Sequence, residues 1–234
     1  VAIVWALLAV DVWRLHLRRI ESAQLQAASV ARTMSERVIR TYRMVDHALR
    51  TIELELREHN AFGDADEITR NLRQSALNLD EVLTIGFDDA RGRSVAHSNP
   101  SIRTGVDYSA SEFFRVHVAD PRLGLYTEQP IKGPATGRRV FTLSRRVTDR
   151  EGRFAGVLVA PILADVLAAA FDEARIGPRG GIGLIHVPTS RVIARQPEFE
   201  KTFSMPVRNE ELIRALAAEP SGRVLNTNAL DNED

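Results

Sequence analysis

Apolar residues recur with a helical period between Ile20 and Leu56. The positions are Ile20, Ala27, Val30, Met34, Val38, Tyr42, Val45, Leu49, Ile52 and Leu56, and after the first step every spacing is three or four residues. Such spacing places one apolar stripe along an α-helix, and neither Gly nor Pro interrupts it. The pattern predicts a single long helix over residues 18–59. Its stripe covers one side of a sheet, pairs with the same helix of a second subunit, or does both at different heights.

The residues before this helix are almost entirely apolar. Val1 to Val10 carries no polar side chain and Asp11 interrupts the run, which is shorter than the roughly 20 residues that a membrane span needs. We interpret residues 1–17 as the end of a transmembrane helix that anchors the chain in the cell inner membrane. The alternative is the remnant of a signal peptide or the end of a buried helix.

After residue 60 the period changes from helices to short strands. Asp64 with Glu67, and Ser109 with Glu112, have the capping-box spacing that begins a helix. The predicted elements are, in order, a helix over 64–79, a strand over 82–87, a turn over 88–93, a strand over 94–98, a short helix from 109 to about 119, and strands over 125–129, 138–147 and 154–160. Connections this short imply antiparallel neighbours. We therefore expect an α+β domain over residues 60–175.

The remaining elements repeat this order on a smaller scale. A helix over 162–172 is followed by a glycine-rich stretch that marks a boundary near residue 176. Then come strands over 182–187 and 191–195, a helix over 209–218 and a strand over 223–227. So few short strands do not close a stable sheet. We therefore interpret residues 176–234 as an incomplete second domain.

Composition and motifs give no sign of catalysis. The 31 basic and 31 acidic side chains balance, which argues against a nucleic-acid-binding surface. Cysteine is absent, so disulfides and thiolate metal sites are excluded. The sequence contains no phosphate-binding loop, no nucleophile elbow and no zinc-protease or calcium-loop pattern. We therefore predict a protein without catalytic residues, metal ligands or a cofactor.

Strand alternation over 138–147 predicts a ligand cavity. One face carries Phe141, Leu143, Arg145 and Val147, and the other carries Val140, Thr142, Ser144 and Arg146. The more apolar face should pack on the long helix, leaving the other to close a cavity with the short aromatic helix. Alternatively, the aromatic pair is plain core and the two arginines are surface cations. The predicted ligand-binding residues are Tyr108, Phe113, Phe114, Tyr126, Thr142, Ser144, Arg145 and Arg146.

The order of these elements resembles the double Cache family, also called the PDC or PAS-like sensor fold. The resemblance is strongest from Gly105 to Leu167. It includes Gly-Val-Asp-Tyr-Ser-Ala-Ser-Glu-Phe-Phe-Arg at 105–115, Gly-Leu-Tyr at 124–126, and Asp-Arg-Glu-Gly-Arg-Phe-Ala-Gly-Val at 149–157. No single motif is diagnostic, and their order carries the weight.

The resemblance implies an extracytoplasmic small-molecule sensor of a bacterial receptor. Residues 60–175 would be the membrane-distal Cache domain and residues 176–234 part of the membrane-proximal one. Ligand occupancy would pass to a cytoplasmic histidine kinase, diguanylate cyclase or chemotaxis domain. We expect a homodimer through the long helix. The alternative is a structural or dimerisation domain that has lost its ligand.

Two departures from the family bear on the ligand. Amino-acid-binding members are similar in an Arg two positions before the aromatic pair and in an Asp on the last strand. Here Ser111 and Ala160 occupy the corresponding positions. The resemblance therefore implies a small-molecule ligand other than an amino acid, and we expect an anion held by Arg146 or Arg145.

Overall fold

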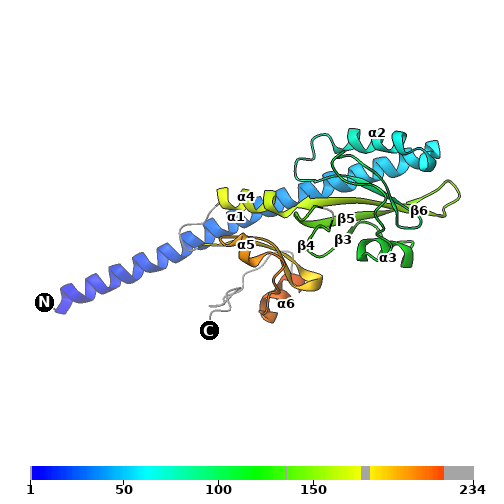
Figure 1. Cartoon of the computed structure of the whole chain (residues 1–234). Coiled ribbons are helices and arrows are strands. Elements are labelled where there is room, and N and C mark those ends of the chain that lie inside the picture. Colours follow the sequence, from blue (N-terminus) through cyan, green and yellow to red (C-terminus); the bar gives the residue numbers. More distant parts are fainter. Residues whose placement is uncertain (1, 135, 175–179, 219–234) are drawn as a thin grey trace.

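One long helix runs the length of the molecule (Figure 1). The computed structural model describes residues 2–134, 136–174 and 180–218. Helix α1 spans Ala2–His59, so it includes both the predicted helix and the apolar segment before it. Within the described residues, no helix combines the length and apolarity that crossing a membrane requires.

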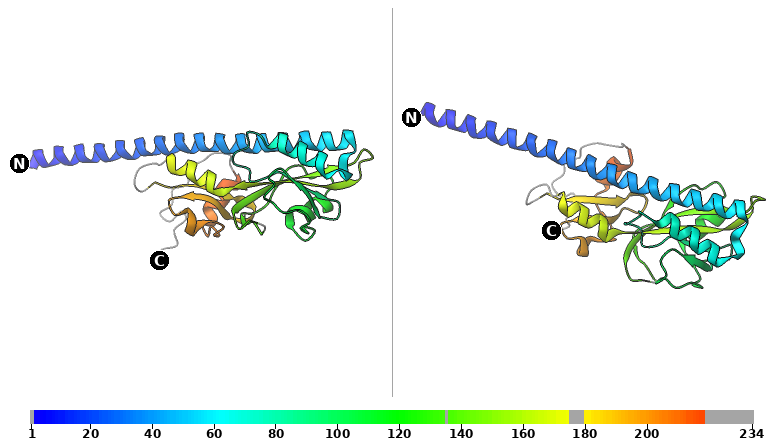
Figure 2. Two further views of the ribbon diagram at one scale, coloured as in Figure 1. Left: turned by 45° about the horizontal axis from the view of Figure 1, so that its top comes forward. Right: turned by 90° about the horizontal axis from the view of Figure 1, so that it is seen from above.

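A six-stranded antiparallel sheet forms the centre of the main domain. The strand order is β2-β1-β6-β5-β3, and β4 also pairs with β5. The strands are β1 (Gly86–Asp89), β2 (Ser94–His97), β3 (Tyr126–Thr127), β4 (Ile131–Lys132), β5 (Arg139–Thr148) and β6 (Phe154–Leu163). Helices α1 and α2 (Ala65–Ala76) cover one face, and α3 (Glu112–Ala119) lies against the other (Figure 2).

The hydrophobic core lies between this sheet and α1. Val45, Leu49, Ile52 and Leu56 of α1 are fully buried. They pack in one cluster with apolar side chains of the sheet and of α2, among them Phe87, Phe141, Leu143, Leu158, Ile68 and Leu72. Each large apolar side chain buried in this way stabilises the fold by roughly 1.5–3 kcal/mol. The predicted stripe of α1 therefore covers the sheet.

The two predicted helix caps have different outcomes. The Asp64 carboxylate accepts hydrogen bonds from the backbone N–H groups of Asp66 and Glu67 at 3.0 and 2.9 Å, so the cap of α2 is confirmed. Helix α3 begins later than predicted, with Ser111 at its N-cap and no side-chain capping bond. Ser109 instead donates its backbone N–H to the Asp107 carboxylate in the preceding turn, and this correction shifts the helix start by two residues.

The first hairpin is also shifted relative to the prediction. Strand β1 includes Asp88 and Asp89, which we had predicted in the turn, whereas Val82 makes only an isolated bridge with Ile162. The turn is organised by the Asp89 carboxylate, which accepts the backbone N–H groups of Arg91 and Arg93. Asp88 is consequently a buried strand residue.

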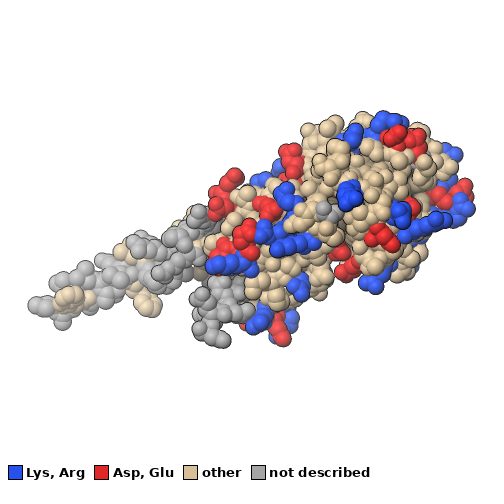
Figure 3. All heavy atoms as spheres, viewed as in Figure 1, with Lys and Arg blue, Asp and Glu red and all other residues tan. Residues whose placement is uncertain are grey.

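The second unit follows α4 (Ala164–Glu173), which packs on β8. It consists of the two-stranded sheet β7 (Ile182–His186) and β8 (Arg191–Gln196), the short helix α5 (Phe199–Thr202), and α6 (Glu210–Ala218). The predicted hairpin and last helix are confirmed, while α5 was not predicted. The predicted strand over 223–227 lies outside the described residues. On the face shown in Figure 3, acidic and basic side chains are intermixed, as the zero net charge suggests.

Candidate ligand-binding site

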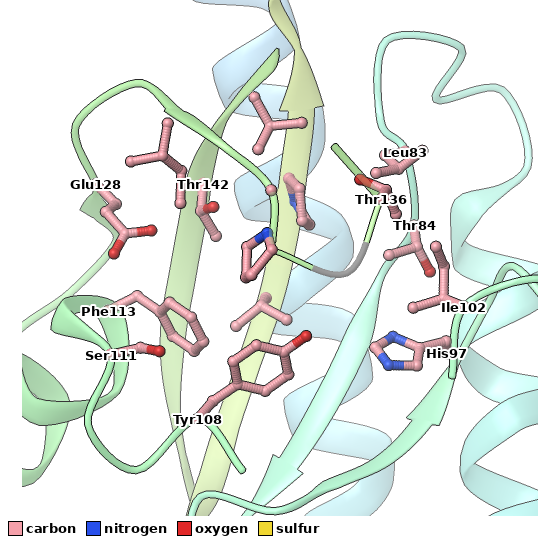
Figure 4. Close-up of a pocket in the computed structure, with 16 residues that line it drawn as sticks. Leu83, Thr84, His97, Ile102, Tyr108, Ser111, Phe113, Glu128, Thr136 and Thr142 are labelled. Atoms are coloured by element: carbon pink, nitrogen blue, oxygen red, sulfur yellow. The ribbon is translucent and has the colours of Figure 1, made fainter. Parts of the chain in front are cut away.

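A cavity of about 100 Å³ lies on the face of the sheet opposite α1 (Figure 4). Strands β5 and β6 form its floor, the start of α3 forms one side, and the segments around residues 97–108 and 128–136 close the remainder. It is lined by Leu83, Thr84, His97, Ile102, Tyr108, Ser111, Phe113, Glu128, Ile131, Gly133, Pro134, Thr136, Val140, Thr142, Val159 and Pro161.

The middle of the cavity is apolar. Val140 and Val159 line it from the adjacent strands β5 and β6, and the rings of Tyr108 and Phe113 line it as well (Figure 4). The two ring centroids are 5.7 Å apart with the planes tilted by 52°. An apolar ligand body would therefore contact both aromatic rings and branched aliphatic side chains.

Glu128 is the acidic residue of the lining. Only 6% of its surface is exposed, and its Oε2 has no hydrogen-bond partner among the described residues. Burial and the nearby Glu112 carboxylate raise the pKa of Glu128 to about 7. Thr142 and the backbone N–H of Phe113 act in the opposite direction. The cavity therefore contains a carboxylate whose ionised form is incompletely stabilised by the protein.

His97 and Thr84 lie across the cavity from Glu128 (Figure 4). Nε2 of His97 shares a hydrogen bond of 2.8 Å with the Ser94 hydroxyl, and burial lowers the pKa of the imidazole. The Thr84 hydroxyl contacts that of Ser98 at 3.2 Å. This side of the cavity is thus polar and uncharged.

Three of the predicted ligand-binding residues line the cavity: Tyr108, Phe113 and Thr142. Phe114, on the same helix, points elsewhere and packs edge-on against Phe154 at 5.6 Å between ring centroids. Tyr126 lies just outside, where its hydroxyl donates to the Glu112 carboxylate at 2.6 Å. Burial and this carboxylate raise the pKa of the Tyr126 phenol.

Ser144 and Arg146 form a separate buried cluster with α3. The Ser144 hydroxyl and Nε2 of His117 are 3.0 Å apart, and both residues are fully buried. Arg146 donates to the backbone carbonyl of His117 and lies over the Phe154 ring, 4.4 Å from its centroid. These contacts fix α3 against the sheet and do not reach the cavity.

Arg145 lies on the other face of the sheet, as the alternation in β5 predicted. Its guanidinium forms an ion pair of 3.2 Å with Asp46 of α1. Neither Arg145 nor Arg146 lines the cavity. The expected anion site at these arginines therefore has no support in the geometry, because both side chains are engaged elsewhere.

The assignment of Ala160 to a cavity position also needs correction. Ala160 packs in the core between the sheet and α1, whereas its neighbours Val159 and Pro161 line the cavity. Counting along β6 was one residue out of register, and that reverses the face. Because Val159 and Pro161 are both uncharged, the absence of an acidic residue from this wall still holds.

Glu128 was not among the predicted ligand-binding residues, although the sequence carries a signal for it. It stands two positions after Tyr126, on the strand predicted over 125–129, so alternation places both on the same side. Ser111, which stands where amino-acid-binding members of the family carry Arg, also lines the cavity. The loop residues Ile102, Pro134 and Thr136 carried no periodic signal.

The chain was compared with protein families, curated proteins and solved structures. No family model and no curated protein matches it. The extracellular domain of rpHK1S-Z16, assigned to a histidine kinase, matches with 25% identity and a TM-score of 0.72, over 89% of this chain and 82% of that one.

Two chemoreceptor domains are similar in fold at lower identity. The ligand-binding domain of Campylobacter jejuni Tlp3 with 4-methylisoleucine gives 13% identity and a TM-score of 0.60, over 82% of this chain and 72% of that one. The Pseudomonas aeruginosa PAO1 amino-acid chemoreceptor PctC with GABA gives 14% and 0.59, over 85% and 83%. The chain thus has the Cache-type fold of an extracytoplasmic ligand-binding sensor domain, of the kind found in histidine kinases and chemoreceptors.

Proposed function

We propose that the cavity beside α3 is the site at which this sensor domain binds a small molecule, with Tyr108, Phe113 and Thr142 in contact with it. The observation that carries the proposal is the buried Glu128 carboxylate, which lines the cavity and lacks a partner at Oε2. An uncompensated buried polar atom costs about 1–3 kcal/mol, and Glu128, unlike the buried Asp88, faces a cavity from which a ligand could supply the missing partner. A bound ligand that hydrogen-bonds to Glu128 would offset that cost.

The other predicted residues have supporting roles in this proposal. Phe114, Ser144 and Arg146 hold α3 in place, and Tyr126 orients Glu112 beside Glu128. The Ser144 hydroxyl and Nε2 of His117 have the spacing of a nucleophile–base pair, but both residues are fully buried and neither lines the cavity. The sensing part is therefore proposed to act by binding alone, with the output domain elsewhere in the receptor.

Strand β5 supplies a physical route from the cavity to α1. Thr142 faces the ligand side, while its neighbours Phe141 and Leu143 pack in the α1 core and Arg145 pairs with Asp46. A ligand that favours one position of β5 would therefore shift the population of α1 positions. In the proposed receptor, residues 1–17, which include the start of α1, anchor the chain in the cell inner membrane, and the sensor lies in the periplasm or outside the cell.

We also propose a homodimer through α1. Leu25, Ile39 and Leu54 are exposed apolar residues at intervals close to four helical turns, so they share one side of the helix. That side is roughly opposite the stripe buried against the sheet. Sedimentation equilibrium should show weaker self-association for Ile39→Glu than for Arg40→Glu, an exposed neighbouring position. Equal association of both variants and the wild type would contradict this interface.

A ligand screen with a cavity-filling variant tests the binding site. A ligand at 100 times its Kd should stabilise the wild-type chain by about 2.7 kcal/mol, and this gain should vanish in Val159→Phe. Val118→Phe places the same ring on the exposed side of α3 and should retain binding. The alternative, a structural domain without a ligand, predicts no stabilisation in a broad screen. Binding unaffected by Val159→Phe would place the site elsewhere.

A further inference from the structure

The charges around the cavity indicate the class of ligand. The described lining contains one carboxylate, Glu128, and neither lysine nor arginine. Among the described residues no cation pairs with Glu128, and its Oε2 is buried without a hydrogen-bond donor. A hydrogen-bond donor on a molecule bound in the cavity could therefore supply the missing partner.

A second carboxylate nearby adds to the excess of acidic over basic groups around the cavity. Glu112 lies close enough to disfavour a negative charge on Glu128, and it accepts a hydrogen bond from the Tyr126 hydroxyl. At the opposite side, His97 is held in its neutral form by burial, so it supplies no positive charge. An anion in this cavity would contact the Glu128 carboxylate, whose negative charge the nearby Glu112 already disfavours, without a compensating cation in the described lining, whereas a cation would neutralise the buried charge.

We propose that the cavity binds a small organic amine in its protonated form, with the ammonium group on Glu128 and the apolar body between Tyr108, Phe113 and the branched side chains of the floor. This inference rests on the proposed function and specifies its ligand class. An ammonium donates the hydrogen bonds that Oε2 lacks, and the adjacent aromatic faces attract cations. The same geometry disfavours α-amino acids, because no cationic side chain lines the cavity to hold their carboxylate.

A matched series of small probes tests the charge requirement. The purified chain is titrated calorimetrically at pH 7 with n-butylamine, n-butanol, butyrate and norvaline, which have similar apolar bodies and differ in their polar groups. We expect n-butylamine to bind at least about tenfold more tightly than the other three. Equal or tighter binding of n-butanol, butyrate or norvaline would overturn the amine proposal.

The second arm tests Glu128 itself. Glu128→Gln keeps the size of the side chain and should weaken n-butylamine binding about tenfold or more, whereas Glu151→Gln, in the exposed β5–β6 turn, should leave it unchanged. If Glu128→Gln fails to fold, Thr142→Val tests the same end of the cavity and should also weaken binding. Unchanged amine affinity in the folded variant would overturn the assignment.

Proton release gives an independent readout. Binding of an ammonium should lower the pKa of Glu128 from about 7, so at pH 7 about half a proton should leave per ligand bound. The value follows from binding enthalpies in buffers of different ionisation enthalpy, and it should fall to near zero in Glu128→Gln. No proton release in the wild type would contradict direct contact with Glu128.

The outcomes separate this inference from the proposed function. A butyrate or n-butanol complex that is lost in Val159→Phe would overturn the amine proposal and support the cavity as the ligand site. Amine binding retained in Val159→Phe would overturn both. If none of the four probes binds to the wild type, the amine proposal is overturned, and the broader screen decides the proposed function alone.

Discussion

Replacement of Asp88 by Asn should change how the stability of the fold depends on pH. Asp88 is fully buried in β1, and neither carboxylate oxygen has a hydrogen-bond partner among the described residues. Burial, with a smaller effect from the neighbouring Asp89 charge, raises its pKa to about 8. Below this pH, the folded protein holds Asp88 mainly as a neutral acid.

The magnitude follows from proton linkage. In the unfolded chain an aspartate titrates near its ordinary value of about 3.9, so between about pH 4 and 8 the folded state binds one more proton than the unfolded state. The free energy of unfolding therefore falls as pH rises through this window, by about 1.36 kcal/mol per pH unit. From pH 5 to pH 7 the loss attributable to Asp88 is about 2.7 kcal/mol. An Asn side chain cannot ionise and does not contribute this loss.

Urea unfolding at pH 5, 6 and 7 measures the effect. We expect the free energy of unfolding of Asp88→Asn, minus that of the wild type, to rise by about 2.7 kcal/mol across this range, whatever its sign at pH 5. Asp66→Asn, in the exposed first turn of α2, is the control and should give a nearly constant difference. A constant difference for Asp88→Asn would refute the reasoning, because it would mean that both states bind protons equally at this position.

Three further changes test other parts of the fold. Gly156→Ala should lower the free energy of unfolding by about 2 kcal/mol or more in urea titrations, because its φ is +152° and the new Cβ would lie 2.1 Å from a backbone carbonyl oxygen of β1; Gly124→Ala, with open space around it, should have little effect. Burial lowers the pKa of His117 to about 4, so stability should fall as pH drops from about 6.5 to 4, and thermal unfolding of His117→Gln should show less of this fall. Arg145→Met should cost about 1–3 kcal/mol, and a double-mutant cycle with Asp46→Asn should show positive coupling; additive effects would contradict a stabilising pair between α1 and the sheet.

The helices and the sheet faces were predicted well from the sequence because the spacing of apolar residues directly reflects which side of a helix or strand is buried. The spacing of three and four in α1 needs only one buried side, and alternation in β5 correctly separated Arg145 from Arg146. The predicted start of the first hairpin turn, at Asp88, was wrong. Aspartate normally favours turns, but of the two aspartates only Asp89 accepts the backbone hydrogen bonds that organise this turn. Aspartate is normally disfavoured in β-strands, so Asp88 is held in β1 by the tertiary structure and not by its own conformational preference.

The candidate site was less predictable than the fold. Tyr108, Phe113 and Thr142 could be placed together because a helix start and a strand face point toward one another. The far wall, including Ile102 and Pro134, comes from loops whose course is set by the whole domain and not by local periodicity. Which of two adjacent residues in β6 faces the cavity depended on a register that counting alone did not fix.

The continuity of α1 has a mechanical consequence. The helix runs unbroken from Ala2 to His59, and among the side chains that the structure describes Met34 is the one nearest its start that packs against the main core. At 1.5 Å per residue, the 32 residues before Met34 form an arm of about 48 Å. A tilt of only about 1° where α1 meets the sheet would displace the start of the arm sideways by about 0.8 Å. A rotation about the helix axis would instead reach the start of the arm with the same angle. The length of the arm therefore amplifies a tilt of α1 into a larger sideways displacement, but it does not amplify a rotation of α1 about its own axis.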